Sequence, residues 1–171
     1  IQKAASAFMQ SPKRLAAAIE QLGSASREDR LEATRTLLNG GDAATQALVG
    51  AAVAEQPASK RDDILRTILA LGGGGTDALR QLALYGKPEV RARALDCLGR
   101  ISAREHIADL VPGLHAQDAS EAERKISAAY LDRIDGVPTR DASIDALAYD
   151  LQHVHDLARQ FKNDGQVVTL W

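Results

Sequence analysis

The chain has 171 residues, of which 45% are hydrophobic and 4% aromatic, and its 21 basic and 23 acidic side chains give a net charge of −2. A single domain of this length buries roughly 70% of the surface of its unfolded chain, so a stable core needs no disulfide. The nearly balanced charge provides no overall field that would attract nucleic acid or an anionic membrane. No apolar stretch approaches the roughly 20 residues that span a bilayer. The single cysteine, Cys97, leaves the compartment open, and the localisation stays unknown.

Helix signals dominate the first half of the chain. Pro12 favours the start of a helix that ends at Gly23, and Ser26 is placed to cap the next, which stops at Asn39-Gly40-Gly41. We expect Asp42 to cap a third helix up to Pro57, and Ser59 or Asp62 to begin a fourth. The residues expected to face inward in these four helices are Leu15, Ile19 and Leu22; Leu31, Thr34, Leu37 and Leu38; Ala44, Leu48 and Val49; and Ile64, Leu65, Ile68 and Leu71.

The second half continues in the same manner. Thr76 or Asp77 is expected to cap a helix that closes near Gly86, and Pro88 begins a helix through PEVRARALDCLGRI. A helix over 104–114 contains Pro112, which predicts a kink or an early end, and Ser120 opens another. The expected inward residues are Leu79, Leu82 and Leu84; Val90, Ala94, Cys97, Leu98 and Ile101; Ile107, Leu110 and Leu114; and Ile126, Tyr130, Leu131 and Ile134.

The helices alternate as pairs with a period of 27 to 33 residues, measured between Leu38, Leu71, Leu98 and Leu131. Such a period is typical of a solenoid, in which short helix pairs stack to bury a shared core. The stretch YGKPEVRARALDCLGRISAREHIADLV resembles a HEAT-type repeat, close to the short phycobilisome-lyase-type version. The matching features are the helix opening Pro88-Glu89-Val90-Arg91, the inner alanines, and Leu98-Gly99-Arg100-Ile101. The resemblance is strongest over 85–114 and looser over 12–56 and 115–136.

The resemblance implies a right-handed superhelix of antiparallel helix pairs that binds other macromolecules. The predicted fold class is therefore all-α: an α-solenoid of about four helix pairs over 1–136, a longer C-terminal capping helix over 137–161, and an extended tail over 162–171. The β-prone run Gln166 to Trp171 either packs as a tail over the cap or leads into a further, β-containing domain. Because the chain also begins at Ile1 without a methionine, the second interpretation is favoured.

The capping helix carries a heptad-like apolar stripe, which we name the seam: Ile144, Leu147, Leu151, Val154, Ala158 and Phe161. Steps of three and four residues suit either a docking face or a self-associating coiled coil. Docking of this helix against the last repeat is the preferred interpretation.

Four glycines in LALGGGGTDAL raise the alternative of a phosphate-binding loop. A P-loop needs a preceding buried strand, the spacing GxxxxGK[ST] and its lysine, whereas Thr76 and Asp77 follow here. The glycines are instead interpreted as a mobile joint between the second and third helix pairs. On this interpretation, deleting two of them should leave the fold intact.

Other candidate sites give weak signals. His153 and His155 diverge by about 200° on a helix and cannot share a metal there, and His106 and His115 have no ligand cluster nearby in the sequence. Cys97 is expected to be a buried, unreactive thiol. The prediction is no catalytic residue, no metal and no cofactor.

Arginines give the only functional hint. Arg66, Arg91, Arg93, Arg100 and Arg104 fall on or beside the second helices of the predicted pairs, which generally line the concave face of HEAT-type solenoids. Arg80 also belongs to the arginine cluster of the third predicted repeat. Arg35, Arg124, Lys125 and Arg133 would extend this stripe, although acidic residues interrupt it. A solvated mixed-charge face is the simpler interpretation, and a partner-binding ridge is the functional one.

We therefore predict a non-catalytic scaffold that binds a protein partner of unknown identity. The first alternative is nucleic-acid binding through the arginines of the third repeat, which the acidic pI of about 6.1 disfavours. The second is an accessory or lyase-like subunit, because bilin lyases use similar repeats.

Overall fold

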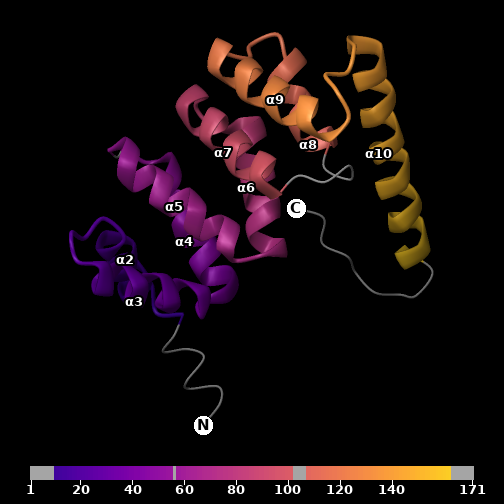
Figure 1. Ribbon diagram of the computed structural model, residues 1–171. Helices are drawn as coiled ribbons and strands as arrows, with labels where there is room; N and C mark the ends of the chain where they lie inside the picture. The colour runs from indigo at the N-terminus through magenta and orange to yellow at the C-terminus, as the bar shows by residue number, and fades with distance from the viewer. Residues whose placement is uncertain (1–9, 56, 102–106, 163–171) are drawn as a thin grey trace.

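The computed structural model describes residues 10–55, 57–101 and 107–162, and within these ranges the chain is all-α, with nine helices and no strand (Figure 1). None of the described helices combines the length and the apolar character that crossing a membrane requires. The helices are α2 Pro12–Gln21, α3 Arg27–Leu38, α4 Gly41–Val53, α5 Ala58–Ala70, α6 Gly73–Tyr85, α7 Pro88–Ile101, α8 Ile107–His115, α9 Glu121–Ile134 and α10 Arg140–Lys162.

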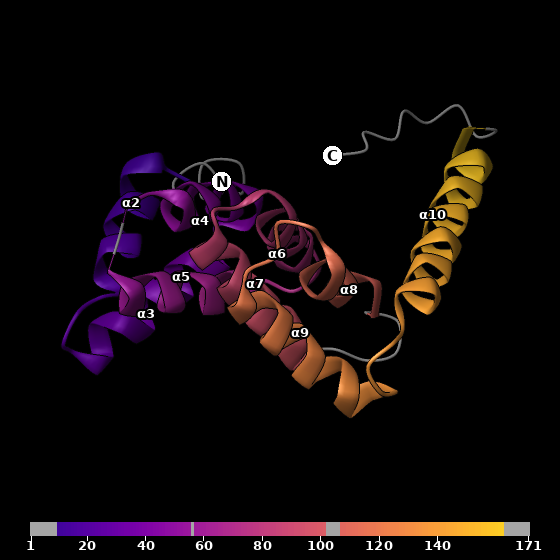
Figure 2. The same cartoon turned by 90° about the horizontal axis from the view of Figure 1, so that it is seen from above.

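The helices lie in two rows. From α2 to α9, each helix packs against the next one in the chain, and also against the one after that. One row therefore contains α2, α4, α6 and α8, and the other contains α3, α5, α7 and α9 (Figure 2). Figure 1 shows α10 beside α8, at the opposite end of the molecule from α2 and α3.

Several predicted helix ends agree with the structure. Ser26 accepts a hydrogen bond from the Asp29 amide, and Ser120 and Glu123 form a reciprocal capping box at the start of α9. Pro12 and Pro88 are the first residues of α2 and α7, where the missing amide hydrogen costs nothing.

Other predicted ends are wrong. The residues before α4 and α5 are Gly40 and Pro57 rather than Asp42 and Ser59, and neither makes a side-chain cap. Pro112 does not end α8, which continues to His115. Pro112 is the sixth of the nine residues of α8 and cannot donate an internal hydrogen bond, but its carbonyl still accepts one from the Ala116 amide at 2.9 Å, so the last turn forms after it.

The core lies between the two rows and is built from leucine, isoleucine, valine and alanine, with no large aromatic side chain among the fully buried residues described. The predicted inward residues of α2, α5 and the first three turns of α7 are buried, apart from Leu71 after α5, which is half-buried. Leu31 and Leu84 are exposed instead, at 55% and 45%. Each lies two positions, about 200° around the helix, from a residue that is buried, Ala33 and Leu82 respectively. Leu38 and Ile101, at helix ends, are also about 40% exposed.

The glycine run forms the start of a helix, which corrects the prediction of a mobile joint. Gly72 has a φ of 76° and ends the turn after α5, and α6 begins directly at Gly73, so Thr76 and Asp77 lie inside the helix and do not cap it. Gly75 is buried, and a Cβ atom built there would collide with the backbone carbonyl of Ile68 in α5. Two of the four glycines therefore have distinct roles: a left-handed backbone at Gly72 and a close helix approach at Gly75.

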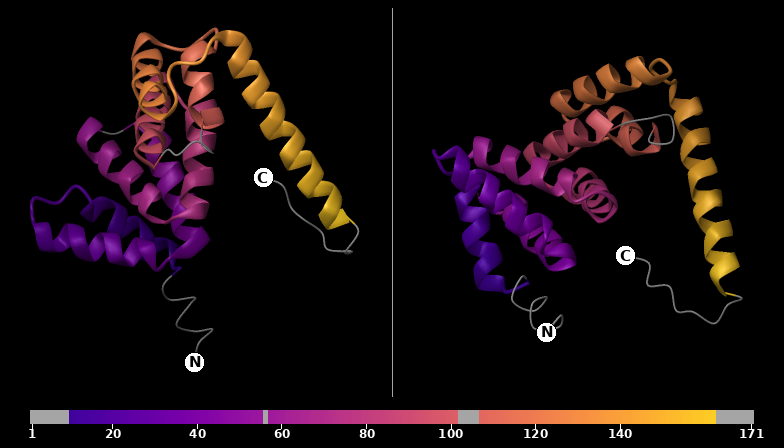
Figure 3. Two further views of the ribbon diagram at one scale, coloured as in Figure 1. Left: turned by 45° about the vertical axis from the view of Figure 1, so that its right-hand side comes forward. Right: turned by 60° about the horizontal axis from the view of Figure 1, so that its bottom comes forward.

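Helix α10 extends away from the two rows (Figure 3). Its packing within the described residues is chiefly against α8, and near its start Ser143 is buried and donates a hydrogen bond to the Thr139 carbonyl. The described side chains of the seam are exposed, so the expected docking of this stripe is wrong for the described part of the chain. The tail over 163–171, with its expected strand, lies outside the described residues.

Candidate interaction surface

Three of the five predicted arginines lie around one hollow between α5 and α7. Arg66 comes from α5, and Arg93 and Arg100 come from α7, with side chains 59%, 52% and 55% exposed. The hollow has a volume of about 40 Å³, which is room for little more than a water molecule. It is therefore a surface feature that a partner would cover, and it is too small for a ligand to enter.

Carboxylates accompany each of these arginines. Arg66 pairs with Asp63 at 2.9 Å, Arg100 with Asp96 at 2.9 Å, and Arg93 approaches Asp62 across the α5–α7 contact at 3.5 Å. The surface is consequently a mosaic of both signs. Such a mosaic suits a partner that carries both charges better than it suits a polyphosphate backbone.

Asp96 also connects this hollow to α9. The Tyr130 hydroxyl donates to Asp96 Oδ1 at 2.8 Å, and the Arg133 guanidinium lies 4.6 Å from the centre of the Tyr130 ring. Burial, followed by the hydrogen bond to Asp96, raises the pKa of Tyr130 above its ordinary value, so the phenol stays a donor.

Arg91 has a different position from the other predicted arginines, which corrects its assignment as an exposed contact residue. Its side chain is only 14% exposed and its Nε donates to Glu123 Oε1 at 2.6 Å. It also donates to the carboxylate and the backbone carbonyl of Asp118, at 2.8 and 3.0 Å. Arg91 therefore joins α7 to the start of α9. Arg104, the fifth predicted arginine, lies outside the described residues.

Glu123 is the buried partner in this joint, 2% exposed. Burial alone would raise its pKa, but hydrogen bonds from Arg91 and from Ser120 outweigh that penalty, so the pKa of Glu123 is lowered. The hydrogen bond to Glu123 in turn raises the pKa of Arg91. Both groups remain charged at neutral pH, as a buried ion pair requires.

A groove between α3 and α5, which sequence reasoning missed, adjoins the hollow. It has a volume of about 340 Å³ and combines apolar Leu22, Leu31 and Ala70 with the arginines Arg27, Arg30 and Arg66. Arg66 lines both features, so the groove and the hollow form one surface, which we name the arginine face. The sequence did not indicate that Leu31 is exposed, because its spacing from Leu37 and Leu38 resembles that of a core residue.

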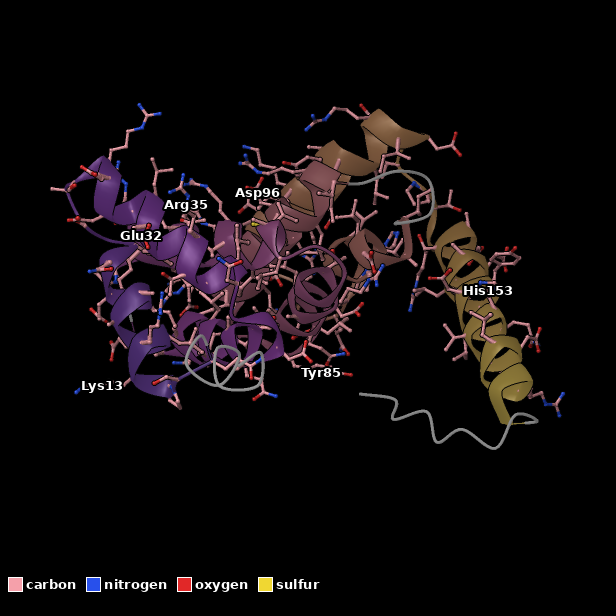
Figure 4. All side chains as sticks on the ribbon, turned by 90° about the horizontal axis from the view of Figure 1, so that it is seen from below. Lys13, Glu32, Arg35, Tyr85, Asp96 and His153 are labelled. Carbon is pink, nitrogen blue, oxygen red and sulfur yellow. The ribbon has the colours of Figure 1, made fainter. Side chains whose placement is uncertain are left out.

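Figure 4 shows how the arginine face is separated from the other row. Glu32 and Arg35 of α3 and Asp96 of α7 project on one side of the molecule, whereas Lys13 of α2 and Tyr85 of α6 project on the opposite side. Tyr85 is 80% exposed and is thus a suitable reference position away from the arginine face.

Cys97 lies beneath the hollow, buried and unpaired by a disulfide. Burial, followed by the nearby charge of Asp96, raises its pKa to about 11. The thiol therefore stays protonated and unreactive at neutral pH.

The remaining candidate sites do not converge. The glycine run follows a helix, α5, and no strand is found before it in the described chain. His153 and His155 are exposed on α10, His115 is exposed at the end of α8, and His106 lies outside the described residues. Within the described ranges, no group of three or more metal-ligating side chains is close enough to hold a metal ion.

A scan against protein-family models finds no match, and a search of the curated proteins finds no significant match either.

Proposed function

We propose that this chain is a HEAT-like α-solenoid of about four helix pairs that acts as a non-catalytic scaffold and presents the arginine face to a protein partner. The two-row packing, in which each helix contacts the next two along the chain, supports the solenoid part of the proposal. In such an array the surface is rigid, because each helix is held from two sides.

One observation carries the binding part of the proposal. Arg66 belongs both to the apolar groove between α3 and α5 and to the charged hollow between α5 and α7. Leu31, 55% exposed, offers an apolar contact at the groove, and Arg66, Arg93 and Arg100 surround the hollow. Protein interfaces combine these two features: an apolar centre and arginine-rich, hydrogen-bonding surroundings.

The test is photo-crosslinking inside cells that produce the protein. A photoreactive amino acid placed at Arg93 should yield a covalent protein adduct of discrete mass, and the Arg66→Glu substitution should abolish it. The same amino acid at Tyr85, on the opposite side, is the matched control and should yield none. Equal adducts at both positions, or none at Arg93, would contradict the proposal.

A second measurement tests nucleic-acid binding, the alternative function. A fluorescent DNA duplex that bound at low salt, with an affinity that fell steeply as salt rose, would replace the protein partner by a phosphate backbone. We expect no binding, because Asp62, Asp63 and Asp96 stand beside the three arginines.

A further inference from the structure

Helix α10 leaves a row of large apolar side chains uncovered by the described chain. Ile144, Leu147, Leu151 and Val154 of the seam are 54%, 40%, 72% and 52% exposed, and the neighbouring Leu157 is 40% exposed. Single exposed apolar residues are ordinary, but a contiguous stripe on one helix marks an interaction site.

The remainder of the described chain is not placed to cover this stripe. Helix α10 packs chiefly against α8, and the residues near its start that are withdrawn from solvent, Ser143 and Ala146, do not belong to the seam. Beyond its first turns the helix extends clear of the two rows (Figure 3). A second helix can therefore approach the seam from outside.

The spacing of the seam residues indicates that the partner is a helix. Steps of three, four and three residues place Ile144 and Leu151 at one core position of a heptad repeat, and Leu147 and Val154 at the other. This period of 3.5 residues keeps an apolar stripe facing one partner helix over its whole length.

The polar residues beside the seam indicate that the partner helix is a second copy of α10. In a parallel pair of helices, the residue just before one core position faces the residue five places further along the partner. Here those residues are Asp150 and His155, and both are exposed. A copy of the same helix in parallel register would bring Asp150 against His155 twice, once on each side. An antiparallel arrangement would instead place Asp150 beside Leu157 or another Asp150.

His155 already has an acidic neighbour on its own helix, because its Nδ1 lies 3.4 Å from Asp156 Oδ1. Asp156 also accepts a hydrogen bond from Gln152 at 2.9 Å. When the imidazole carries both protons, its other ring nitrogen can donate to Asp150 of a second copy. The intrahelical contact and the proposed one can therefore coexist.

We propose that α10 pairs with α10 of a second copy of this chain as a parallel, in-register coiled coil, which makes the protein a homodimer. Helix α10 packs chiefly against α8 and lies away from Asp96 on the arginine face, so pairing leaves the arginine faces of both copies open (Figure 4). The dimer would be bivalent, and a partner with two epitopes would bind it more tightly than a single copy.

Cysteine crosslinking tests both the pairing and its direction. Leu151→Cys and Val154→Cys each place a thiol in the seam, and in a parallel in-register dimer each variant forms a disulfide with its own copy under mild oxidation. Tyr149→Cys and Gln152→Cys, outside the seam, are matched controls that should stay monomeric in non-reducing gels. The wild-type chain is a further control, because its Cys97 is buried.

Two crosslinking results would contradict the proposal. Crosslinks that form only when the Leu151→Cys and Val154→Cys chains are mixed would indicate antiparallel pairing and overturn the proposed register. Crosslinks at the control positions to the same extent as in the seam would indicate random collision and overturn the pairing itself.

A mass measurement checks the dimer without new thiols. Light scattering should give twice the chain mass of 18.3 kDa for the wild type, and Leu151→Asp should weaken self-association by at least about tenfold, since it removes an apolar core contact from each copy. The variant should retain the wild-type circular dichroism and melting temperature, because Leu151 is 72% exposed in the single chain. A wild type that remains monomeric at high concentration would overturn the proposal, and so would a Leu151→Asp variant as dimeric as the wild type.

Discussion

Helix α7 joins its two neighbours in the same row in contrasting ways. Toward α9 it uses Arg91, 14% exposed, whose Nε lies 2.6 Å from the oxygen of a buried glutamate, Glu123. Toward α5 it uses Arg93, 52% exposed, which lies 3.5 Å from Asp62. The two arginines are two residues apart in one helix, yet only the first is held by a hydrogen-bonded, desolvated pair.

The difference separates residues that hold the stack together from residues available to a partner. A buried pair is costly to break, because the remaining charge loses its solvent and its partner. An exposed pair is worth little to stability and exchanges easily with charges of another protein. The α7–α9 joint is therefore structural, and the α5–α7 hollow is the part of the contact that we propose for the partner.

The largest expected effect comes from removing Glu123. Glu123→Ala leaves Arg91 without its closest partner and deletes the capping box of α9, so we expect a loss of about 3 kcal/mol in the free energy of unfolding. Urea denaturation measures it. Asp118→Ala removes a 74% exposed partner of the same arginine and is the matched control, with an expected loss below about 1 kcal/mol. Equal losses would show that burial does not distinguish the two carboxylates.

Substitutions in the first turn of α6 test how closely this helix packs against α5. Gly75→Ala adds a methyl group against the Ile68 carbonyl and should cost about 1–3 kcal/mol. Gly74→Ala, one residue away, has open space around its Cβ and lies in the first turn of a helix, so it should stabilise the protein by up to about 1 kcal/mol. Thermal melting of both variants measures the contrast, and a destabilised Gly74→Ala would contradict it.

Acid should affect the α7–α9 joint selectively. Because the pKa of Glu123 is lowered on folding, its contribution to stability is present above its unfolded pKa of about 4.3 and is lost as the pH falls through the folded value. The difference in unfolding free energy between the wild type and Glu123→Gln should accordingly be constant between pH 7 and 5 and shrink below about pH 4. Urea titrations at successive pH values test this, and a constant difference down to pH 3 would count against the pair.

The smallest stability effect is expected at the hollow. Arg93→Ala breaks an exposed, loosely spaced pair and should change the free energy of unfolding by less than about 0.5 kcal/mol. The same variant should nevertheless reduce the crosslinking yield of a probe at Arg100, if the arginine face binds a partner. If Arg93→Ala lowered the free energy of unfolding as much as Glu123→Ala, the two contacts of α7 would not differ as described.

Local signals in the sequence predicted most helices and their best caps. Ser26 and Ser120 stand three residues before an acidic side chain, and Pro12 and Pro88 open their helices, so these ends depend on neighbours within one turn. The all-helical class follows from the same signals.

The exceptions depend on residues far apart in the chain. Arg91 had the same sequence signature as Arg93, and only the fold shows that Glu123, 32 residues later, is its partner. Gly75 resembled a loop residue because its constraint, the Ile68 carbonyl, belongs to the preceding helix. The seam of α10 was visible as a pattern, but a pattern does not show whether a neighbour covers it.

The carboxylate of Glu123 makes two attachments at once. One oxygen accepts from Arg91 of α7, and the other accepts from the Ser120 amide at 2.7 Å as well as from Arg91 at 3.3 Å. The first turns of α7 and α9 therefore have one common anchor, and neither can fray without releasing the other. In hydrogen exchange such segments open together as one cooperative unit, so the amides of the first turns of α7 and α9 should show similar protection.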